Sequence, residues 1–361
     1  MGLIESIFDI TYLIVVVALG IRLSLLKEKQ AKLFGIMAIF LGLGDAFHLL
    51  PRVLAHLSKD GFIRYQAALS WGEFITGITM TIFYVLFYFY YRSISKDFDN
   101  KKKYIVYLLA AIRIILILLP QNNWGLPDKN YTMGIVRNIP FAIMGLLLII
   151  WTYRKRQIHG LEKMSLLISL SFIFYIPVVL WVNKIPALGA LMMPKTIAYV
   201  LIVVEGFKYF IKDFKAINIL DMSITYLITG LVAGVFYREF TKYYSFTEGG
   251  HLAKLHPHTL VLGFVVTIII FILVKNLKQN DINNFKKPIH IYNTGLIATL
   301  STMTVYGIFD VVGNGENTIN ISAMSGFSGL GHLLLAIGFI YTLLNIRKVS
   351  QTNNISLTNT K

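Results

Sequence analysis

The chain reads EGGHLAKLHPHTLVLG at residues 248–263, and this stretch holds three of its eight histidines. No charged residue occurs from His256 to Val274, so the histidines stand at the mouth of a long apolar run. An apolar run of about 20 residues matches a helix that crosses a bilayer core of about 30 Å. The stretch therefore predicts a membrane-spanning helix that carries imidazole groups at one end.

The composition of the whole chain extends this interpretation. Hydrophobic residues make up 56% of its 361 positions and charged residues only 14%, whereas a soluble domain has about 25% charged residues. The chain has no cysteine, which excludes disulfides, thiolate catalysis and cysteine-ligated iron–sulfur or zinc sites. We therefore expect a membrane protein without cysteine chemistry.

Eleven apolar segments recur along the chain, and in lipid each must be helical, because a lone strand would leave backbone groups unpaired. Glu5 and Asp9 precede the first segment, where a secretory signal would have basic residues, so this segment is predicted to be a retained helix. The predicted fold class is an all-α polytopic membrane protein with about 11 transmembrane helices. The segments lie at residues 8–26, 33–54, 67–91, 104–120, 138–153, 164–182, 188–211, 222–240, 257–277, 289–310 and 327–346.

The basic residues indicate how these helices are oriented. Most of the 34 Lys and Arg residues fall in alternate loops, such as 92–103, 154–163 and 275–287. Because cytoplasmic loops are enriched in Lys and Arg, the pattern predicts that the N-terminus lies outside and the C-terminus inside. The net charge of +16 then reflects topology, and anionic lipid headgroups are the only polyanion it requires. We expect a multi-pass protein of a bacterial cytoplasmic membrane, with the lipid bilayer as partner and no nucleic-acid binding.

A short charged segment, residues 212–218, divides the apolar segments into a group of seven and a group of four. We predict a seven-helix module over residues 1–215 and a four-helix module over residues 216–348. The tail, residues 349–361, is rich in Asn, Ser and Thr, and we predict that it is disordered.

Ionisable residues within the first module are candidates for function, because a charge inside a membrane is costly. Asp45, His48 and Arg52 have the spacing i, i+3, i+7, which places them on one helix face. Most of the candidates are expected in the outer half of the membrane, around a pocket open to the outside. The full set is Asp45, His48, Arg52, Glu73, Arg113, Arg137 and Lys195.

Paired charges are one interpretation of this set. Asp45 would pair with Arg113 or Lys195, and Glu73 with Arg137, so that the pairs fix the packing of the helices. A pocket for a small polar or anionic solute, in a transporter or a receptor, is the second interpretation. Both place the same side chains close together, and the sequence does not separate them.

A membrane hydrolase that uses Asp45 and His48 is a third interpretation. The first module offers only His48 and His56 as suitable imidazoles, fewer than a zinc site with three histidine ligands needs. The chain shows no phosphate-binding glycine loop and no nucleophile elbow, which argues against an ATP-driven pump. The sequence therefore leaves open whether the protein is an enzyme.

Both modules resemble uncharacterised families. In the first, the runs 44–52, 79–84 and 119–124 resemble a set of bacterial seven-helix membrane proteins, and this resemblance implies no activity. In the second, three motifs in order resemble a small four-helix bacterial membrane domain of unknown function, which implies a fold and a family. These motifs are Gly234–Phe240, the pattern HxHxLxLG at residues 256–263, and Gly326–Gly331 followed by His332.

The histidines of the second module suggest a cofactor site. The predicted helix directions bring His256, His258 and His332 to one membrane face, where two imidazoles on facing helices would ligate haem iron axially. Arg238 and Lys254 would then meet the haem propionates at the water boundary. The same end of the module would alternatively hold zinc, copper or another transition metal. The candidate metal ligands are His251, His256, His258, His332 and Glu239.

Two simpler roles for these histidines stay open: hydrogen bonds from a helix mouth to neighbouring carbonyl groups, and proton relay or pH sensing. From the sequence we favour haem or transition-metal binding, in a redox or sensory membrane protein. The solute transporter or receptor is the alternative, and the membrane hydrolase is the third hypothesis.

The third apolar segment is unusually rich in aromatic residues. Because aromatic side chains gather at membrane interfaces, we expect these rings to form an interfacial belt or to pack against lipid. They are Phe83, Tyr84, Phe87, Tyr88, Phe89, Tyr90 and Tyr91.

Overall fold

The computed structural model describes the backbone of residues 2–128, 130–312 and 321–358. The chain divides into two compact units, Met1–Lys212 and Asp213–Lys361, which we call unit 1 and unit 2. The expected boundary, between residues 215 and 216, lies three residues further along the chain. Each unit is described below by itself.

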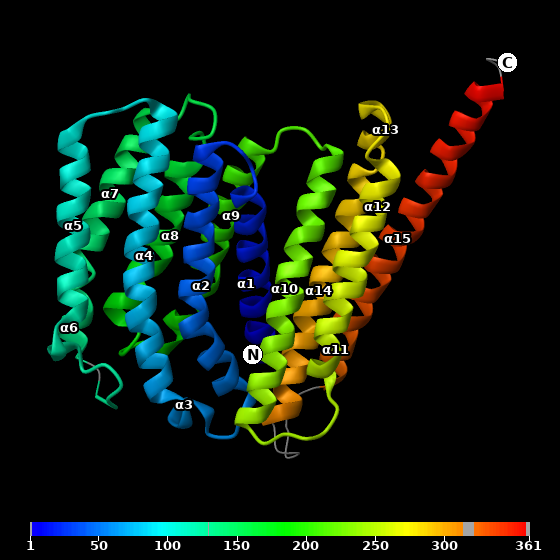
Figure 1. Ribbon diagram of the computed structural model, residues 1–361. Helices are drawn as coiled ribbons and strands as arrows, with labels where there is room; N and C mark the ends of the chain where they lie inside the picture. The colour runs from blue at the N-terminus through cyan, green and yellow to red at the C-terminus, as the bar shows by residue number, and fades with distance from the viewer. Residues whose placement is uncertain (1, 129, 313–320, 359–361) are drawn as a thin grey trace. The chain divides into compact units, whose positions relative to one another are not determined.

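Unit 1 consists of long helices that run side by side, joined by short helical turns (Figure 1). The long helices are α1 (Gly2–Ser24), α2 (Lys29–Leu57), α4 (Gln66–Ser95), α5 (Asn100–Leu118), α7 (Ile139–Arg154), α8 (Met164–Trp181) and α9 (Met192–Phe210). The short elements are α3 (Gly61–Arg64), η1 (Pro120–Asn122), α6 (Tyr131–Val136) and η2 (Pro186–Leu191).

Unit 2 is also helical over its described residues. One of its helices is continuous in three parts, of which the middle part has π geometry. The elements are α10 (Ala216–Tyr243), α11 (His251–His258), η3 (Thr259–Val265), α12 (Val266–Val274), α13 (Gln279–Asn283), α14 (Lys286–Val312) and α15 (Ile321–Thr358).

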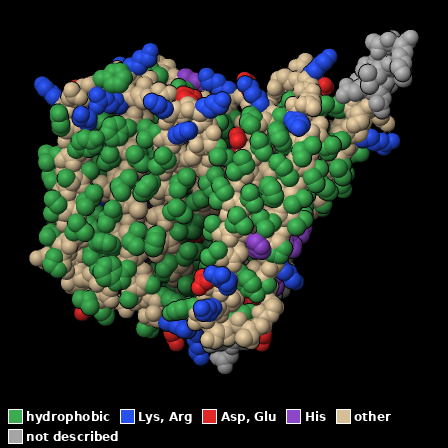
Figure 2. Space-filling model, in the orientation of Figure 1, with side chains coloured by type: hydrophobic (Ala, Val, Ile, Leu, Met, Phe, Trp, Pro, Cys, Tyr) green, Lys and Arg blue, Asp and Glu red, His purple; other side chains and the backbone are tan. Residues whose placement is uncertain are grey.

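Within the described parts of the chain, ten helical stretches are long and apolar enough to cross a membrane. The helix α5 matches the expected segment 104–120 but is not among the ten, and Lys101, Lys102, Lys103 and Arg113 all lie within it. In Figure 2, hydrophobic side chains cover the sides of the unit 1 helices, and Lys and Arg side chains gather at one end. The predicted fold class, an all-α polytopic membrane protein, is confirmed.

The aromatic residues of α4 form the core of unit 1. Six of the seven rings are buried, with at most 1% of their surface exposed, and only Phe89 is partly exposed. They pack edge to face against other helices, as in Tyr84 with Phe141 at 5.0 Å and Phe34 with Tyr90 at 4.7 Å between ring centroids. The expected packing of these rings against lipid is therefore wrong, because α4 packs against α2, α5 and α7 and turns the rings inward.

Two glycines let α2 and α4 approach closely. A Cβ atom on Gly72 of α4 would lie 2.3 Å from the carbonyl oxygen of Phe47, and one on Gly44 of α2 would lie 2.0 Å from the Thr79 hydroxyl. The Oγ1 of Thr76 also donates to the carbonyl of Gly44 at 3.0 Å. These small-residue contacts position α2 and α4 at the level of the pocket described below.

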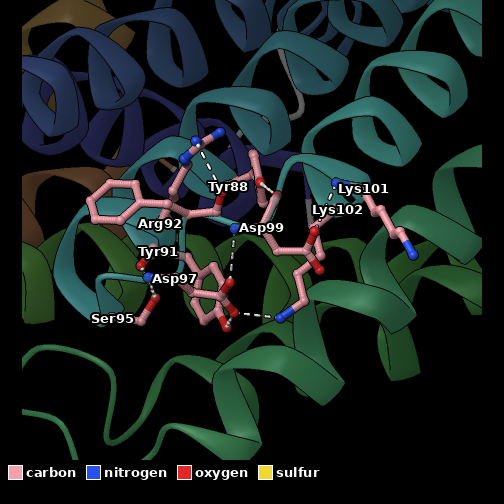
Figure 3. Close-up of polar contacts among 9 residues, drawn as sticks. Tyr88, Tyr91, Arg92, Ser95, Asp97, Asp99, Lys101 and Lys102 are labelled. Atoms are coloured by element: carbon pink, nitrogen blue, oxygen red, sulfur yellow. Dashed lines mark hydrogen bonds and ion pairs between the residues drawn. The ribbon is translucent and has the colours of Figure 1, made fainter.

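The turn between α4 and α5 is held by a compact polar cluster (Figure 3). Asp97 accepts hydrogen bonds from the Tyr91 hydroxyl at 2.9 Å and from the Lys102 ammonium, and it also accepts from the backbone N–H of Asp99. Burial alone would raise the pKa of Asp97, but these bonds outweigh it and hold the pKa below its usual value. Asp99 in turn caps α5 by accepting from the N–H of Lys101 at 2.8 Å.

The last helix is longer than expected. It continues to Thr358, through most of the stretch 349–361 that we predicted to be disordered, and residues 359–361 lie outside the described part of the chain. No glycine or proline follows Gly338, so no residue breaks the helix in this stretch.

Within unit 2, α14 and α15 cross at a backbone-to-backbone contact. A Cβ atom on Gly295 would lie 2.3 Å from the backbone nitrogen of Leu335, and one on Gly338 would lie 2.3 Å from that of Tyr292. Only glycine permits this separation, as in other close helix pairs in membranes.

Candidate functional site

A cavity of about 290 Å³ lies within unit 1, between side chains of α2, α4, α5, α7, α8 and α9. Its lining combines charged groups with apolar and aromatic ones, which is usual for a ligand pocket. The ionisable side chains that line it, tyrosines aside, are His48, Glu73, Arg113, Arg137 and Lys195.

Arg113 of α5 is the most deeply buried cation of the lining, with 3% of its surface exposed. Its guanidinium carbon lies 3.5 Å from the centroid of the Phe141 ring, a stacked arrangement. Its Nε and Nη1 have no hydrogen-bond partner within the described structure. A buried guanidinium without a hydrogen-bond acceptor is costly, so Arg113 leaves in the pocket lining a positive charge that an anion would balance.

Arg137, directly after α6, is held from several sides. Its Nη1 donates to the Oδ1 of Asn122 at 2.8 Å, its Nη2 lies 3.9 Å from a carboxylate oxygen of Glu73, and its guanidinium stacks on Trp124. Asn122 is buried, and its Nδ2 donates to the carbonyl of Leu116 near the end of α5 at 2.8 Å. Arg137 is thus fixed by the structure that ends α5.

Lys195 of α9 is buried between two tyrosine rings. Its Nζ lies 4.8 Å from the ring centroid of Tyr175 and 5.5 Å from that of Tyr199. Asp45 of α2 lies within electrostatic range of this ammonium group and accepts a hydrogen bond of 2.5 Å from the Tyr12 hydroxyl. Lys195 therefore has an opposite charge close to the pocket wall, whereas Arg113 does not.

The predicted site residues of the first module divide into two groups. Five of the seven line the cavity, as given above. Asp45 lies next to the cavity without lining it. Arg52 instead pairs with Glu5 of α1, whose other carboxylate oxygen lies 3.3 Å from the Nε2 of His56. Of the charge pairs expected from the sequence, Glu73 lies near Arg137 and Asp45 near Lys195, while Arg113 has neither.

Sequence reasoning missed the residues that shape this cavity around the charges. Asn122 and Trp124, which support Arg137, are not among the predicted site residues. Phe141 and Tyr175 are not among the predicted site residues either, because no spacing rule relates them to Arg113. The only available signal was the loop itself, where a helix-ending proline is followed by polar residues and a tryptophan.

The histidines of unit 2 are each engaged locally. The Nδ1 of His256 bonds to the carbonyl of Gly230 on α10 at 2.8 Å. The Nδ1 of His258 bonds to the Lys254 carbonyl at 2.9 Å, and the Nδ1 of His332 to that of Ser328 at 2.8 Å. A carbonyl only accepts, so Nδ1 is the donor in each of these three contacts.

Three further members of the predicted set, His251, Arg238 and Glu239, are also paired. His251 bonds through Nδ1 to a carboxylate oxygen of Asp310 at 2.8 Å and stacks on Tyr306. Arg238 pairs with its neighbour Glu239 at 2.7 Å. Among the residues that the structure describes, no group of three or more His, Cys, Asp or Glu side chains is placed to hold a metal ion. Binding of haem or a transition metal stays a prediction.

Comparison with known proteins adds a family for one part of the chain. Residues 217–349, nearly all of unit 2, match the model of a family described as a protein of unknown function (DUF2871). The resemblance expected from the motifs of the second module is therefore confirmed. No curated protein matches the chain, and no solved structure does.

Proposed function

We propose that unit 1 binds a small polar solute in the cavity around Arg113 and acts as a receptor or a carrier for it. The observation that supports this most directly is a buried arginine in the lining of a cavity, two of whose nitrogens have no hydrogen-bond acceptor within the described structure. At about 290 Å³, the cavity lies near the lower limit of the range of about 300–1,000 Å³ that ligand pockets occupy. The solute is accordingly small.

A thermal-stability screen of the purified protein tests this proposal. The protein is heated with a panel of small carboxylates, amino acids, amines, sugars and nucleosides, because a ligand that binds only the folded state raises the unfolding temperature. A second protein carries Val178→Trp, which places a large ring in the cavity wall. Its control is Ile173→Trp on the same helix, at a position that is 60% exposed.

We expect at least one solute to stabilise the parent protein and the Ile173→Trp control but not the Val178→Trp variant. Failure of every solute to stabilise the parent would contradict the proposal, as would equal stabilisation of the Val178→Trp variant. Uptake of the same solute into vesicles that contain the protein then separates a carrier from a receptor.

A further inference from the structure

The charges around the cavity indicate which class of solute it takes. Resting on the proposed function, we propose that the ligand is a small organic monocarboxylate whose carboxylate pairs with Arg113 and whose apolar body lies beside Phe141 and Tyr175. Three features of the pocket support this: the geometry of the guanidinium, the balance of charge and the apolar walls.

The first feature is the guanidinium itself. Its central carbon lies 3.5 Å from the centroid of the Phe141 ring, and its N–H donors lie along the edges of a planar group. Donors in that plane match the two oxygens of a carboxylate, which Arg binds in a bidentate manner. Nε and Nη1 are closed off from the surface and have no acceptor within the described structure, so no hydrogen-bonded partner balances the charge of Arg113 at these two atoms.

The second feature is the number of opposite charges already present. Arg137 has Glu73 at 3.9 Å, and Lys195 has Asp45 within electrostatic range. Among the described residues, no carboxylate pairs with the third cation of the lining, Arg113. A ligand with one negative charge restores neutrality in a buried site, whereas a dianion would carry an uncompensated charge into it, which is costly.

The third feature is the apolar lining beyond the guanidinium. Met80 and Ile117 line the cavity together with Phe141, Tyr175, Val178 and Val179. An inorganic anion would leave this surface in contact with water, while an organic body would cover it and gain about 25 cal/mol per Å² of apolar surface buried. The walls therefore favour an anion that carries a compact hydrocarbon or aromatic part.

The test compares four probes by titration calorimetry on the full-length protein. Benzoate has one carboxylate and a flat apolar ring, and benzamide has the same shape without the charge. Terephthalate adds a second carboxylate to the ring, and inorganic phosphate lacks an apolar body. We expect benzoate to bind at least about tenfold more tightly than the other three, since hydrogen bonds to charged groups contribute about 1.5–3 kcal/mol.

Two variants locate the anion. Arg113→Gln removes the guanidinium charge. We expect it to lower the affinity for benzoate about 10- to 100-fold and to leave the affinity for benzamide no lower. Lys101→Gln removes a cation from the exposed start of the same helix and should leave the affinity for benzoate unchanged. Should Arg113→Gln fail to fold, comparing the affinities of the parent protein for benzoate and benzamide still tests whether the ligand must carry a carboxylate.

The outcomes separate this inference from the proposed function. If benzamide binds as well as benzoate, or if Arg113→Gln binds benzoate normally, the carboxylate assignment is overturned while a solute pocket still stands. If the best ligand proves to be phosphate or a dianion, the assignment is overturned too. Loss of benzoate binding in both Arg113→Gln and Val178→Trp, but in neither control, supports the two proposals together.

Discussion

Asn122 uses both ends of its amide group at the point where α5 ends. Its nitrogen donates to the carbonyls of Leu116 and Leu119, each at 2.8 Å, and its oxygen accepts from Arg137. Carbonyl groups at the end of a helix have no partner inside the helix. One buried side chain therefore caps α5 and also fixes a cation of the pocket.

Replacing Asn122 by Ala is expected to lower the free energy of unfolding by about 1–3 kcal/mol, because buried polar partners lose their hydrogen bonds. The control is Gln121→Ala, a change at an exposed neighbouring position. Thermal unfolding of both variants provides the measurement. Equal unfolding temperatures for the two would contradict the structural role of Asn122.

Asp97 makes the stability of unit 1 depend on pH. Because its pKa lies below the usual value in the folded protein, its stabilising contribution is complete above the unfolded pKa of about 3.9. That contribution is lost as the pH falls through the lower, folded pKa. The variant Asp97→Asn should therefore be less stable than the parent at pH 6, by a difference that shrinks toward pH 3.

Unfolding curves at several pH values measure this difference. Asp128→Asn, a change at an exposed loop carboxylate, is the control. A stability difference between Asp97→Asn and the parent that stays constant from pH 6 to pH 3 would mean that the cluster in Figure 3 does not stabilise the ionised carboxylate.

At the scale of helices, the α14–α15 crossing depends on the absence of a side chain. In the variant Gly338→Leu, the new Cβ would meet the backbone of Tyr292. Overpacking of this kind costs about 1–3 kcal/mol, and rigid backbone on the other side leaves little room to adjust. The matched control is Gly326→Leu in the same helix, where a Cβ would meet nothing within 4 Å.

Thermal unfolding of unit 2, followed by a probe placed in α14, compares the two variants. We expect a clear loss of stability in Gly338→Leu and little change in Gly326→Leu. Similar losses in both would show that the contact with Tyr292 does not limit the spacing of these helices.

The sequence predicts where the helices lie along the chain, but it does not predict which face of a helix packs against its neighbours. A single apolar segment in lipid must be helical, because only a helix pairs the backbone groups within one segment. Segments such as 33–54 and 67–91 therefore predict α2 and α4 directly. The same argument fails for Tyr84 and Tyr90, since a ring suits lipid and a protein core equally well. Composition does not report which neighbour a helix face will meet.

The candidate site shows the same limit. An arginine within an apolar run marks Arg113 as unusual, and its position in a pocket was a reasonable expectation. Its stacking on Phe141 and its lack of a carboxylate depend on how α5 and α7 pack. For His258 and His332, comparable depth along their helices favours a shared site, while in the structure each ring bonds to a carbonyl of its own helix.

At the scale of the whole molecule, the orientation predicted from the basic loops is directly testable. The chain has no cysteine, so single cysteines can be introduced without removing any. Cysteine at Asp128 or Gly249 should react with an impermeant reagent added outside intact cells. Cysteine at Gln157 or Asn280 should react only after the membrane is opened.

All four positions are exposed in the structure, so differences in reaction report the side of the membrane. The opposite pattern at all four sites would reverse the predicted orientation. A mixed pattern would mean that the order of crossings differs from the one proposed here.

The π segment η3, Thr259–Val265, also bears on how unit 2 tolerates the deletion of a residue. Its hydrogen bonds reach one residue further than those of an α-helix. The carbonyl of Leu262 accepts from the Tyr292 hydroxyl at 2.6 Å, and that of Phe264 from the Ser223 hydroxyl at 3.1 Å. A π turn contains one residue more than the corresponding α turn. Removing a single residue from η3 would therefore close it to α geometry and leave the inward and outward faces of α12 in place.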